Sequence, residues 1–309
     1  MKKKISRRDF LLSTAMGLSA AVIPGIAFPV RARAGEPAFP ELVFATGDPA
    51  PATVAAINAI GGMKRFVKKG QKVCIKPNFS FANPPEAATT THPEVVKAIA
   101  EEARKAGARE ITIVDNVLHR EEACLEKTGI KVCETVPGTL VKPLTSSRFF
   151  RHVDIPDGKQ LKEARVLEPV LDADVFIAAP VAKSHSAAGV SLSMKGMMGV
   201  VKNRMVFHAI YDLHTAIVDL AFRVKPDLVI IDATRLLSDH GPGGPGKVLH
   251  PRTVIASTDM VAADAATVSL GEWYGRRVKP RQVKHIAEAA KRGLGRIDWE
   301  NLAIARVKS

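Results

Sequence analysis

Short, almost unbroken apolar runs recur along the chain from residue 42 onward, and they predict β-strands. Two of them read Val-Phe-Ile-Ala-Ala and Leu-Val-Ile-Ile-Asp. Continuous apolar runs of this length are typical of strands that are covered on both faces of a sheet. The predicted strands are Leu42–Thr46, Lys72–Lys76, Glu110–Asp115, Asp174–Ala178, Asp227–Asp232 and Thr253–Ser257.

Amphipathic stretches between these runs predict helices. One helix is expected to begin near Thr91, because Glu94 follows three residues later in a capping-box pattern, and to end at Gly107. Further helices are expected over about 51–68, 207–223, 259–272 and 280–292. Strands that alternate with helices predict an α/β fold, with a mostly parallel sheet and helices on both faces.

Residues 138–168 interrupt this alternation. Leu140–Pro143 and Phe149–Val153 resemble antiparallel or edge strands, so we expect a small inserted β element there. No repeat, low-complexity linker or domain boundary is visible elsewhere. The sequence therefore predicts one α/β domain over residues 35–309, with an insertion around 138–168.

The N-terminus has the pattern of an export signal. Ser6–Leu11 matches the twin-arginine motif, an apolar stretch over 11–30 follows, and Ala32–Ala34 forms a small-x-small cleavage site. A single membrane span is the alternative, but two glycines and two prolines interrupt the apolar stretch. We expect residues 1–34 to be a cleaved signal, with a periplasmic mature protein and no permanent membrane span.

The net charge of the chain indicates which class of partner to expect. The predicted signal carries seven basic residues and one acidic residue, so the formal charge of +14 becomes +8 in the mature chain. The excess is spread along the sequence, and no basic run is interleaved with aromatic residues. A nucleic-acid partner is therefore not expected, whereas an anionic small molecule or an acidic partner protein is.

The three cysteines, Cys74, Cys124 and Cys133, are dispersed. None of their spacings suits a zinc or iron–sulfur site, so we do not expect an intrinsic cluster. Whether Cys124 and Cys133 form a disulfide is left open by the sequence.

Polar residues follow several of the predicted strands, where ligands bind in open α/β sheets. We expect these strand ends to meet in one site: Lys76–Asn78, Asp115–Asn116, Lys183–His185, Asp232 and Ser257–Asp259.

Two lysines and two histidines are the sharpest candidates within that site. Lys183 lies two residues from His185, and Lys195 follows in a segment of small residues that lets an anion approach the backbone closely. We expect Lys183 and Lys195 to hold negative charge. His185 and His208 are then expected to be catalytic proton-transfer groups or metal ligands.

The environment of His208 allows two interpretations. On one helix over 207–223, His208 and Asp212 would stand at positions i and i+4, with Thr215 and Asp219 on the same face. The pair would then share a metal or polarise each other. Alternatively, this polar stripe simply faces water.

The segment Gly241–Lys247 literally matches a phosphate-binding loop. However, Val248 stands where a magnesium-binding hydroxyl is needed, and Pro242 and Pro245 each remove an N–H donor. We therefore expect a loop that overhangs the strand ends rather than a nucleotide site.

Several segments occur together, in order, as in a known family: Cys74–Asn78, Thr91–Val96, Lys183–His185, Met194–Gly199, His208, Gly241–Gly243 and Asp259–Asp264. Over about residues 43–299 the chain resembles domain-of-unknown-function family 362. The resemblance implies one site that contains Lys76, Asn78, His92, Lys183, His185, Lys195, His208 and Asp264. Many family members carry a cysteine-rich ferredoxin-like domain, which this sequence lacks.

Two functions from different classes remain. In the first, an exported protein binds an anionic small molecule or a metal-containing cofactor, with redox or acid–base chemistry; Lys76, Asn78, His92, Asp115, Lys195 and Asp264 would bind the ligand. In the second, the protein is a non-catalytic accessory or assembly factor for an exported redox enzyme, which would be its partner. A histidine-linked metalloenzyme reminiscent of nickel-dependent racemases is a third, resting on histidine content and fold class.

Overall fold

A mixed sheet runs through the centre of residues 39–309, the part of the chain that the computed structural model describes. Its main path has the order β13-β1-β12-β10-β7-β2-β3-β4. All neighbours on this path are parallel except the two pairs that contain β12. The strands are β13 (Ile304–Lys308), β1 (Leu42–Thr46), β12 (Thr253–Ser257), β10 (Leu228–Leu237), β7 (Val175–Ala179), β2 (Lys72–Pro77), β3 (Glu110–Asp115) and β4 (Thr139–Pro143).

Three short strands extend the sheet beside β10. β8 (Val181–His185) continues almost directly from β7 and runs parallel to the second half of β10. β9 (Gly189–Ser191) pairs with β8, and β11 (Val248–Leu249) pairs with β10. This arrangement carries Lys183 and His185 beyond the end of β7.

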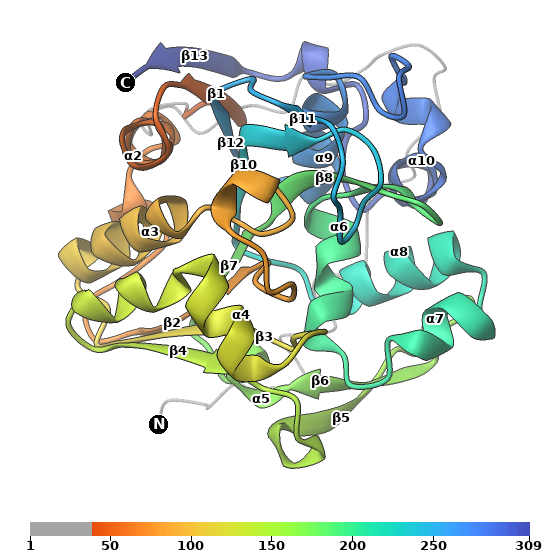
Figure 1. The fold of residues 1–309 in the computed structure, drawn as a ribbon, viewed down its shortest axis with the longest axis horizontal. Coiled ribbons are helices and arrows are strands. Elements are labelled where there is room, and N and C mark those ends of the chain that lie inside the picture. The colour runs from red at the N-terminus through yellow and green to blue at the C-terminus, as the bar shows by residue number, and fades with distance from the viewer. Residues whose placement is uncertain (1–38) are drawn as a thin grey trace, which may run out of the picture. The chain divides into compact units, whose positions relative to one another are not determined.

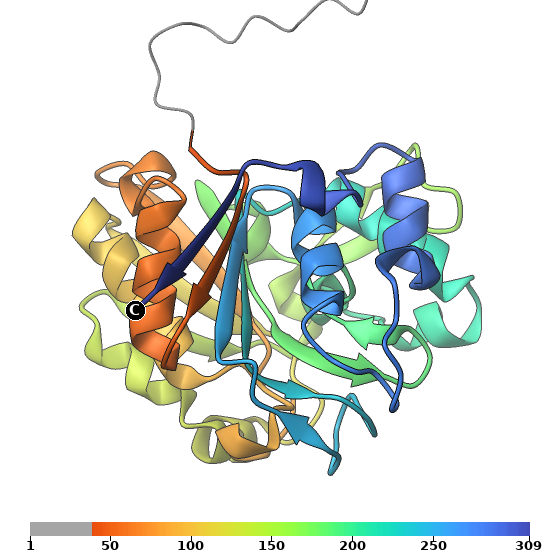
Figure 2. The same cartoon turned by 90° about the horizontal axis from the view of Figure 1, so that it is seen from above.

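Helices cover both faces of the sheet (Figures 1 and 2). Side chains of α2 (Pro49–Ala59), α3 (Pro93–Ala106) and α4 (Glu121–Thr128) join one core, and those of α8 (Leu213–Arg223), α9 (Met260–Val268) and α10 (Lys284–Lys291) join the other. Successive residues of β2 alternate between the two cores: Val73 and Ile75 belong to one, and Cys74 to the other. The predicted fold class is confirmed.

The strand β12 runs against its neighbours, which corrects one expectation about the site. Ser257 pairs with Leu42 on one side and with Val229 on the other. The carboxyl end of β12 therefore lies where β1 and β10 begin. Ser257 and Asp259 are at the opposite edge from the other predicted strand ends, and Asp259 caps α9 instead.

The predicted insertion around 138–168 is too long at its start. Thr139–Pro143 is β4, the edge strand of the main sheet, and it is parallel to β3. Leu140 is 48% exposed while Val141 is buried, so only one face of this strand is covered. Only β5 (Phe150–Asp154) and β6 (Glu163–Leu167) form a separate antiparallel pair, followed by α5 (Glu168–Leu171).

The helix predicted over 207–223 is two helices, α7 (Met205–Ala209) and α8. Asp212 lies between them and caps α8 by accepting a hydrogen bond from the Thr215 amide at 2.9 Å. His208 and Asp212 therefore do not share a helix face, and the predicted i, i+4 pair is wrong.

The alternative, a water-facing stripe, is also wrong for Asp219. Its carboxylate is fully buried and accepts hydrogen bonds from the amides of Gln160, at 2.7 Å, and Leu161, at 2.9 Å. The Arg292 guanidinium pairs with it at 2.6 Å. Asp219 thus ties α8 to the loop that joins β5 and β6.

The three cysteines are buried free thiols, so Cys124 and Cys133 are not bridged. Burial raises the thiol pKa to about 12 for Cys74 and Cys133, and to about 11 for Cys124. None of the helices in residues 39–309 is long and apolar enough to cross a membrane. The predicted signal, residues 1–34, lies outside the described residues.

Replacing Asp219 with alanine should lower the free energy of unfolding by about 3–5 kcal/mol, because Arg292 and two amides would lose their buried partner. The matched control is Asp212→Ala on the same helix, where loss of an exposed cap is expected to cost about 1 kcal/mol. Urea unfolding of both variants measures the difference. Equal losses would contradict the structural role assigned to Asp219.

Candidate functional site

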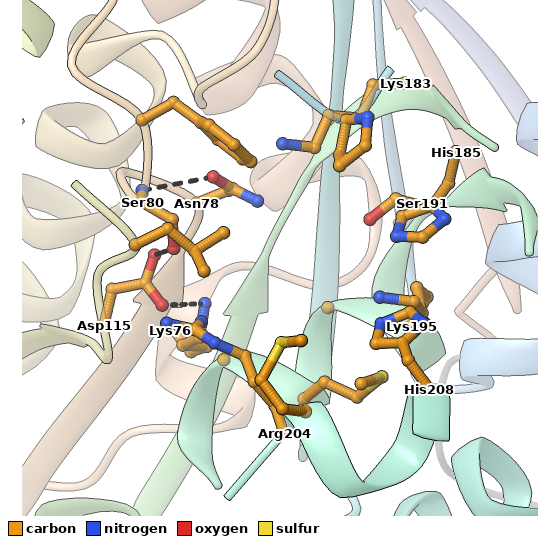
Figure 3. Close-up of a pocket in the computed structure, with 17 residues that line it drawn as sticks. Lys76, Asn78, Ser80, Asp115, Lys183, His185, Ser191, Lys195, Arg204 and His208 are labelled. Atoms are coloured by element: carbon orange, nitrogen blue, oxygen red, sulfur yellow. Dashed lines mark hydrogen bonds and ion pairs between the residues drawn. The ribbon is translucent and has the colours of Figure 1, made fainter. Parts of the chain in front are cut away.

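A cavity of about 140 Å³ lies beyond the carboxyl ends of β2, β3 and β8 (Figure 3). This is the edge at which open α/β sheets bind ligands. The structure brings seven of the nine candidate residues to its walls, namely Lys76, Asn78, Asp115, Lys183, His185, Lys195 and His208. The walls also contain Ser80, Phe81, Leu118, Ser191, Gly196, Met198, Gly199, Arg204, Met205 and Pro242.

One wall is built around a buried ion pair between neighbouring strands. The Lys76 ammonium, on β2, lies 3.0 Å from Asp115 Oδ1, on β3. The other carboxylate oxygen of Asp115 accepts hydrogen bonds from the Phe79 amide at 3.0 Å and the Ser80 hydroxyl at 2.8 Å. Asp115 therefore neutralises Lys76 and also holds the loop after β2.

Gly199 lies directly against this pair, in the turn Met197–Val200. A Cβ atom there would stand 2.6 Å from Asp115 Oδ1 and 2.8 Å from Lys76 Nζ. The Gly199 carbonyl also accepts a hydrogen bond from the Asn116 amide at 2.9 Å. Only glycine allows the backbone to approach the ion pair this closely.

Lys183 forms the upper part of the cavity in Figure 3. Its ammonium donates to the Thr89 carbonyl at 2.6 Å and lies 4.3 Å from the centroid of the Phe81 ring. Burial holds the pKa of Lys183 well below its ordinary value. The backbone of Gly241 contacts the same strand, donating to the Ser184 hydroxyl at 3.0 Å, so the glycine–proline loop overhangs the site.

Lys195 enters the cavity from α6 (Ser193–Gly196). Within residues 39–309 its ammonium has no hydrogen-bond acceptor or carboxylate partner. Burial, together with the nearby Arg204 guanidinium, lowers the pKa of Lys195 to about 7. Lys195 can therefore gain or lose a proton near neutral pH.

Asp264 does not line the cavity, although it was expected to bind the ligand. It lies on α9, where its carboxylate accepts from the amides of Ser193 at 2.8 Å and Met194 at 3.1 Å. Burial raises its pKa to about 7. Asp264 therefore positions the segment that carries Lys195 and does not meet a ligand in the cavity.

His92 is the second candidate that lies elsewhere. Its Nδ1 accepts from the Glu94 amide at 3.2 Å, so His92, and not Thr91, caps α3. The His92 amide donates to the buried carboxylate of Asp232, which pairs with Arg235 at 2.6 Å. The predicted capping box of Thr91 and Glu94 is therefore wrong, because the helix begins one residue later and His92 caps it. Asp232 is part of a structural ion pair.

The rings of His185 and His208 lie parallel to each other, with centroids 5.6 Å apart and planes 3° from parallel. Nδ1 of His185 accepts from the amides of Ala187 at 3.2 Å and Ala188 at 3.3 Å. Burial, Lys195 and the neighbouring His208 lower the pKa of His185 to about 2, so the ring stays neutral with its proton on Nε2. His185 therefore offers an N–H donor.

This arrangement does not fit the metal site predicted at His185 and His208. In neutral His185 one nitrogen accepts two amides and the other carries the proton, which leaves no lone pair for a metal. Moreover, no cluster of three or more histidine, cysteine or acidic side chains in residues 39–309 is placed to hold a metal ion.

Arg204 is a cavity residue that sequence reasoning missed. It lies just before α7 and donates to the Val117 carbonyl at 2.9 Å, while burial lowers its pKa. No motif surrounds it in the sequence, and its place depends on the turn that follows Gly199. Ser80 and Ser191 were also missed: Ser80 is held at the cavity by its hydrogen bond to Asp115, and Ser191 by the pairing of β9 with β8.

The family model for "Domain of unknown function (DUF362)" matches residues 73–269. The chain belongs to this family. The resemblance drawn from the sequence motifs is therefore confirmed. The site described above falls almost entirely within the matched region of the DUF362 fold.

Relatives of this DUF362 chain include a thylakoid-associated protein from Synechocystis sp., 29% identical over 217 residues. That match covers 67% of this chain and 65% of the relative. Two solved structures have lower similarity. The lactate racemase apoprotein from Thermoanaerobacterium thermosaccharolyticum gives a TM-score of 0.46 at 14% identity, covering 71% of this chain and 54% of that one. A protein from Thermotoga maritima gives a TM-score of 0.40 at 12% sequence identity, and the match covers 60% of this chain and 51% of that one.

Replacing Gly199 with alanine should destabilise the protein by about 1–3 kcal/mol, because the new methyl group would push into the Lys76–Asp115 pair. Gly196→Ala, three residues earlier, is the matched control. Its Cβ would meet only Pro180, at 3.7 Å, which is ordinary van der Waals contact. Urea unfolding should show a loss for the first variant alone; a loss of the same size in both would contradict the close packing at Gly199.

Proposed function

We propose that this cavity binds a small molecule that carries negative charge. The observation that carries the proposal is the imbalance of charge on the walls. Four basic side chains line the cavity, Lys76, Lys183, Lys195 and Arg204, against the single carboxylate of Asp115. Buried cations are unfavourable unless they are paired, so a bound anion would offset this burial.

The only carboxylate that residues 39–309 place on these walls is already paired, so most of the basic side chains have no acidic partner there. Asp115 already pairs with Lys76, which leaves Lys183, Lys195 and Arg204 without a carboxylate on these walls. Neutral donors stand beside them. His185 presents its Nε2–H, and the side-chain Oδ1 of Asn78 accepts a hydrogen bond from the Ser80 backbone amide at 3.3 Å, so the side-chain Nδ2 of Asn78 faces the cavity as a donor. These groups suit carboxylate, phosphate or sulfate oxygens.

The volume supports a small ligand. The cavity is partly open to solvent and has a volume of about 140 Å³, below the range typical of sites for drug-sized ligands. It therefore suits a few heavy atoms better than a nucleotide. Lys195 is placed to exchange a proton with such a ligand near neutral pH. Acid–base chemistry on a small anion is therefore the reaction class that we propose.

Oxalate is a suitable probe, because its charge does not change between pH 6 and pH 9. Wild-type protein should bind oxalate in isothermal titration calorimetry at pH 7. Lys183→Met and Arg204→Met should each bind about tenfold to a hundredfold more weakly, because each removes a charged donor. The control is Lys105→Met, whose side chain is 67% exposed and should leave binding unchanged.

The pH dependence of the same titration has a definite sign. Only protonated Lys195 attracts an anion, and its pKa is about 7, so affinity should be full at pH 6. It should then fall by up to about tenfold per pH unit above pH 7. Lys195→Met should show a shallower profile. A wild-type protein that binds no oxalate, or binds it as well in all variants, would contradict the proposal; a stoichiometric partner protein in that case would favour the accessory function.

We also propose that the mature protein works in the periplasm, because Ser6–Leu11 matches the twin-arginine motif. In a bacterium with an active twin-arginine pathway, the double variant Arg7→Lys/Arg8→Lys should remain in the cytoplasm. The control is Lys3→Arg/Lys4→Arg, which keeps the charge outside the motif. Immunoblots of periplasmic and cytoplasmic fractions measure the outcome, and equal export of both variants would contradict the proposal.

A further inference from the structure

Lys195 differs from the other two lysines of the cavity in what its amine contacts. Lys76 pairs with Asp115 at 3.0 Å, and Lys183 donates to the Thr89 carbonyl at 2.6 Å beneath the Phe81 ring. The Lys195 amine has neither kind of partner within residues 39–309, yet it lines the cavity. A primary amine that lines a small polar cavity without a hydrogen-bond acceptor is free to attack a bound ligand as a nucleophile.

The neighbours of Lys195 suit the same chemistry. Arg204 lies close enough for its charge to act on Lys195, and Lys195 in turn acts on the rings of His185 and His208. A buried lysine beside another cation is a recognised arrangement for amines that attack carbonyl carbons. Asp264 fixes the backbone just before Lys195 through two hydrogen bonds, so the amine starts from a rigid element.

We propose that Lys195 forms an imine with the carbonyl carbon of a small oxo acid bound in this cavity. The inference rests on the proposed anion-binding function and specifies the ligand class: an aldehyde or ketone group next to a carboxylate. The carboxylate would lie against the cations, while the carbonyl carbon meets the Lys195 amine.

The step balances without an oxidant or a reductant. The lone pair of Lys195 Nζ forms a C–N bond, and the carbonyl π electrons move to oxygen, which takes up one of the two amine protons. The resulting carbinolamine then loses its hydroxyl group together with the remaining amine proton as one water molecule, which leaves a C=N bond. The Nε2–H of His185 and the Lys183 ammonium are the donors on the walls for the developing oxyanion.

The protonation state of Lys195 supports this role. With its pKa near 7, about half of the Lys195 side chains are uncharged amines at neutral pH. An exposed lysine, with a pKa near 10.4, is uncharged roughly a thousandfold less often at the same pH. Neutral conditions therefore favour reaction at Lys195 over the many lysines on the surface.

Glyoxylate, the smallest oxo acid, is the probe. Wild-type protein is incubated with limiting glyoxylate at pH 7, reduced with cyanoborohydride, and analysed by intact and peptide mass spectrometry. One adduct is expected per chain, on the peptide that contains Lys195, at least about tenfold above that of exposed Lys105. Lys195→Arg should lose the adduct from the intact mass, and Arg204→Met should reduce labelling of Lys195.

Acetaldehyde, which lacks the carboxylate, is the matched reagent and should label Lys195 far less. Labelling spread evenly over surface lysines, or concentrated on Lys76 or Lys183, would overturn the inference. Oxalate binding distinguishes a failure of the imine proposal from a failure of the anion-binding proposal. Oxalate that binds while glyoxylate leaves Lys195 unlabelled overturns the imine alone. Oxalate that fails to bind, with glyoxylate and acetaldehyde labelling Lys195 equally, overturns the anion site and with it the oxo-acid class.

Discussion

The ion pair between Lys76 and Asp115 is the contact on which the candidate site depends. It joins the ends of two adjacent parallel strands, and the same carboxylate holds the Phe79 and Ser80 loop by two further hydrogen bonds. Gly199 packs against the pair, and the cavity wall that follows Gly199 is placed by that contact. Because the pair is buried, removing either partner would leave an unpaired charge beneath the whole site.

Around this neutral pair, the cavity collects basic side chains for which residues 39–309 supply no further carboxylate on its walls. Burial depresses the pKa of Lys183, Lys195 and Arg204, which shows that the folded chain holds these groups at some energetic cost. Sites that break the rule of paired buried charges are commonly functional. Lys195, whose amine has no hydrogen-bond or carboxylate partner within residues 39–309, has a pKa of about 7.

Hydrogen bonds from the backbone decide what the polar residues here can do. Two amides occupy Nδ1 of His185, which makes its ring a neutral donor and removes it as a metal ligand. Two amides of the Lys195 segment occupy the carboxylate of Asp264, which makes it a positioning residue. In both cases the residue type allowed several roles, and local geometry selected one.

The sequence by itself determined the fold class, six of the eight strands on the main path of the sheet and the identity of seven cavity residues. Apolar periodicity marks the strands, and short local motifs, at strand ends or in the segments after them, mark the cavity residues. Tertiary structure alone decided the direction of β12, since that depends on pairing Ser257 with Leu42 across the whole domain. It also decided that Asp219 is buried and that Arg204 joins the site. Burial and proximity arise from distant segments packing together, and no local pattern in the chain encodes them.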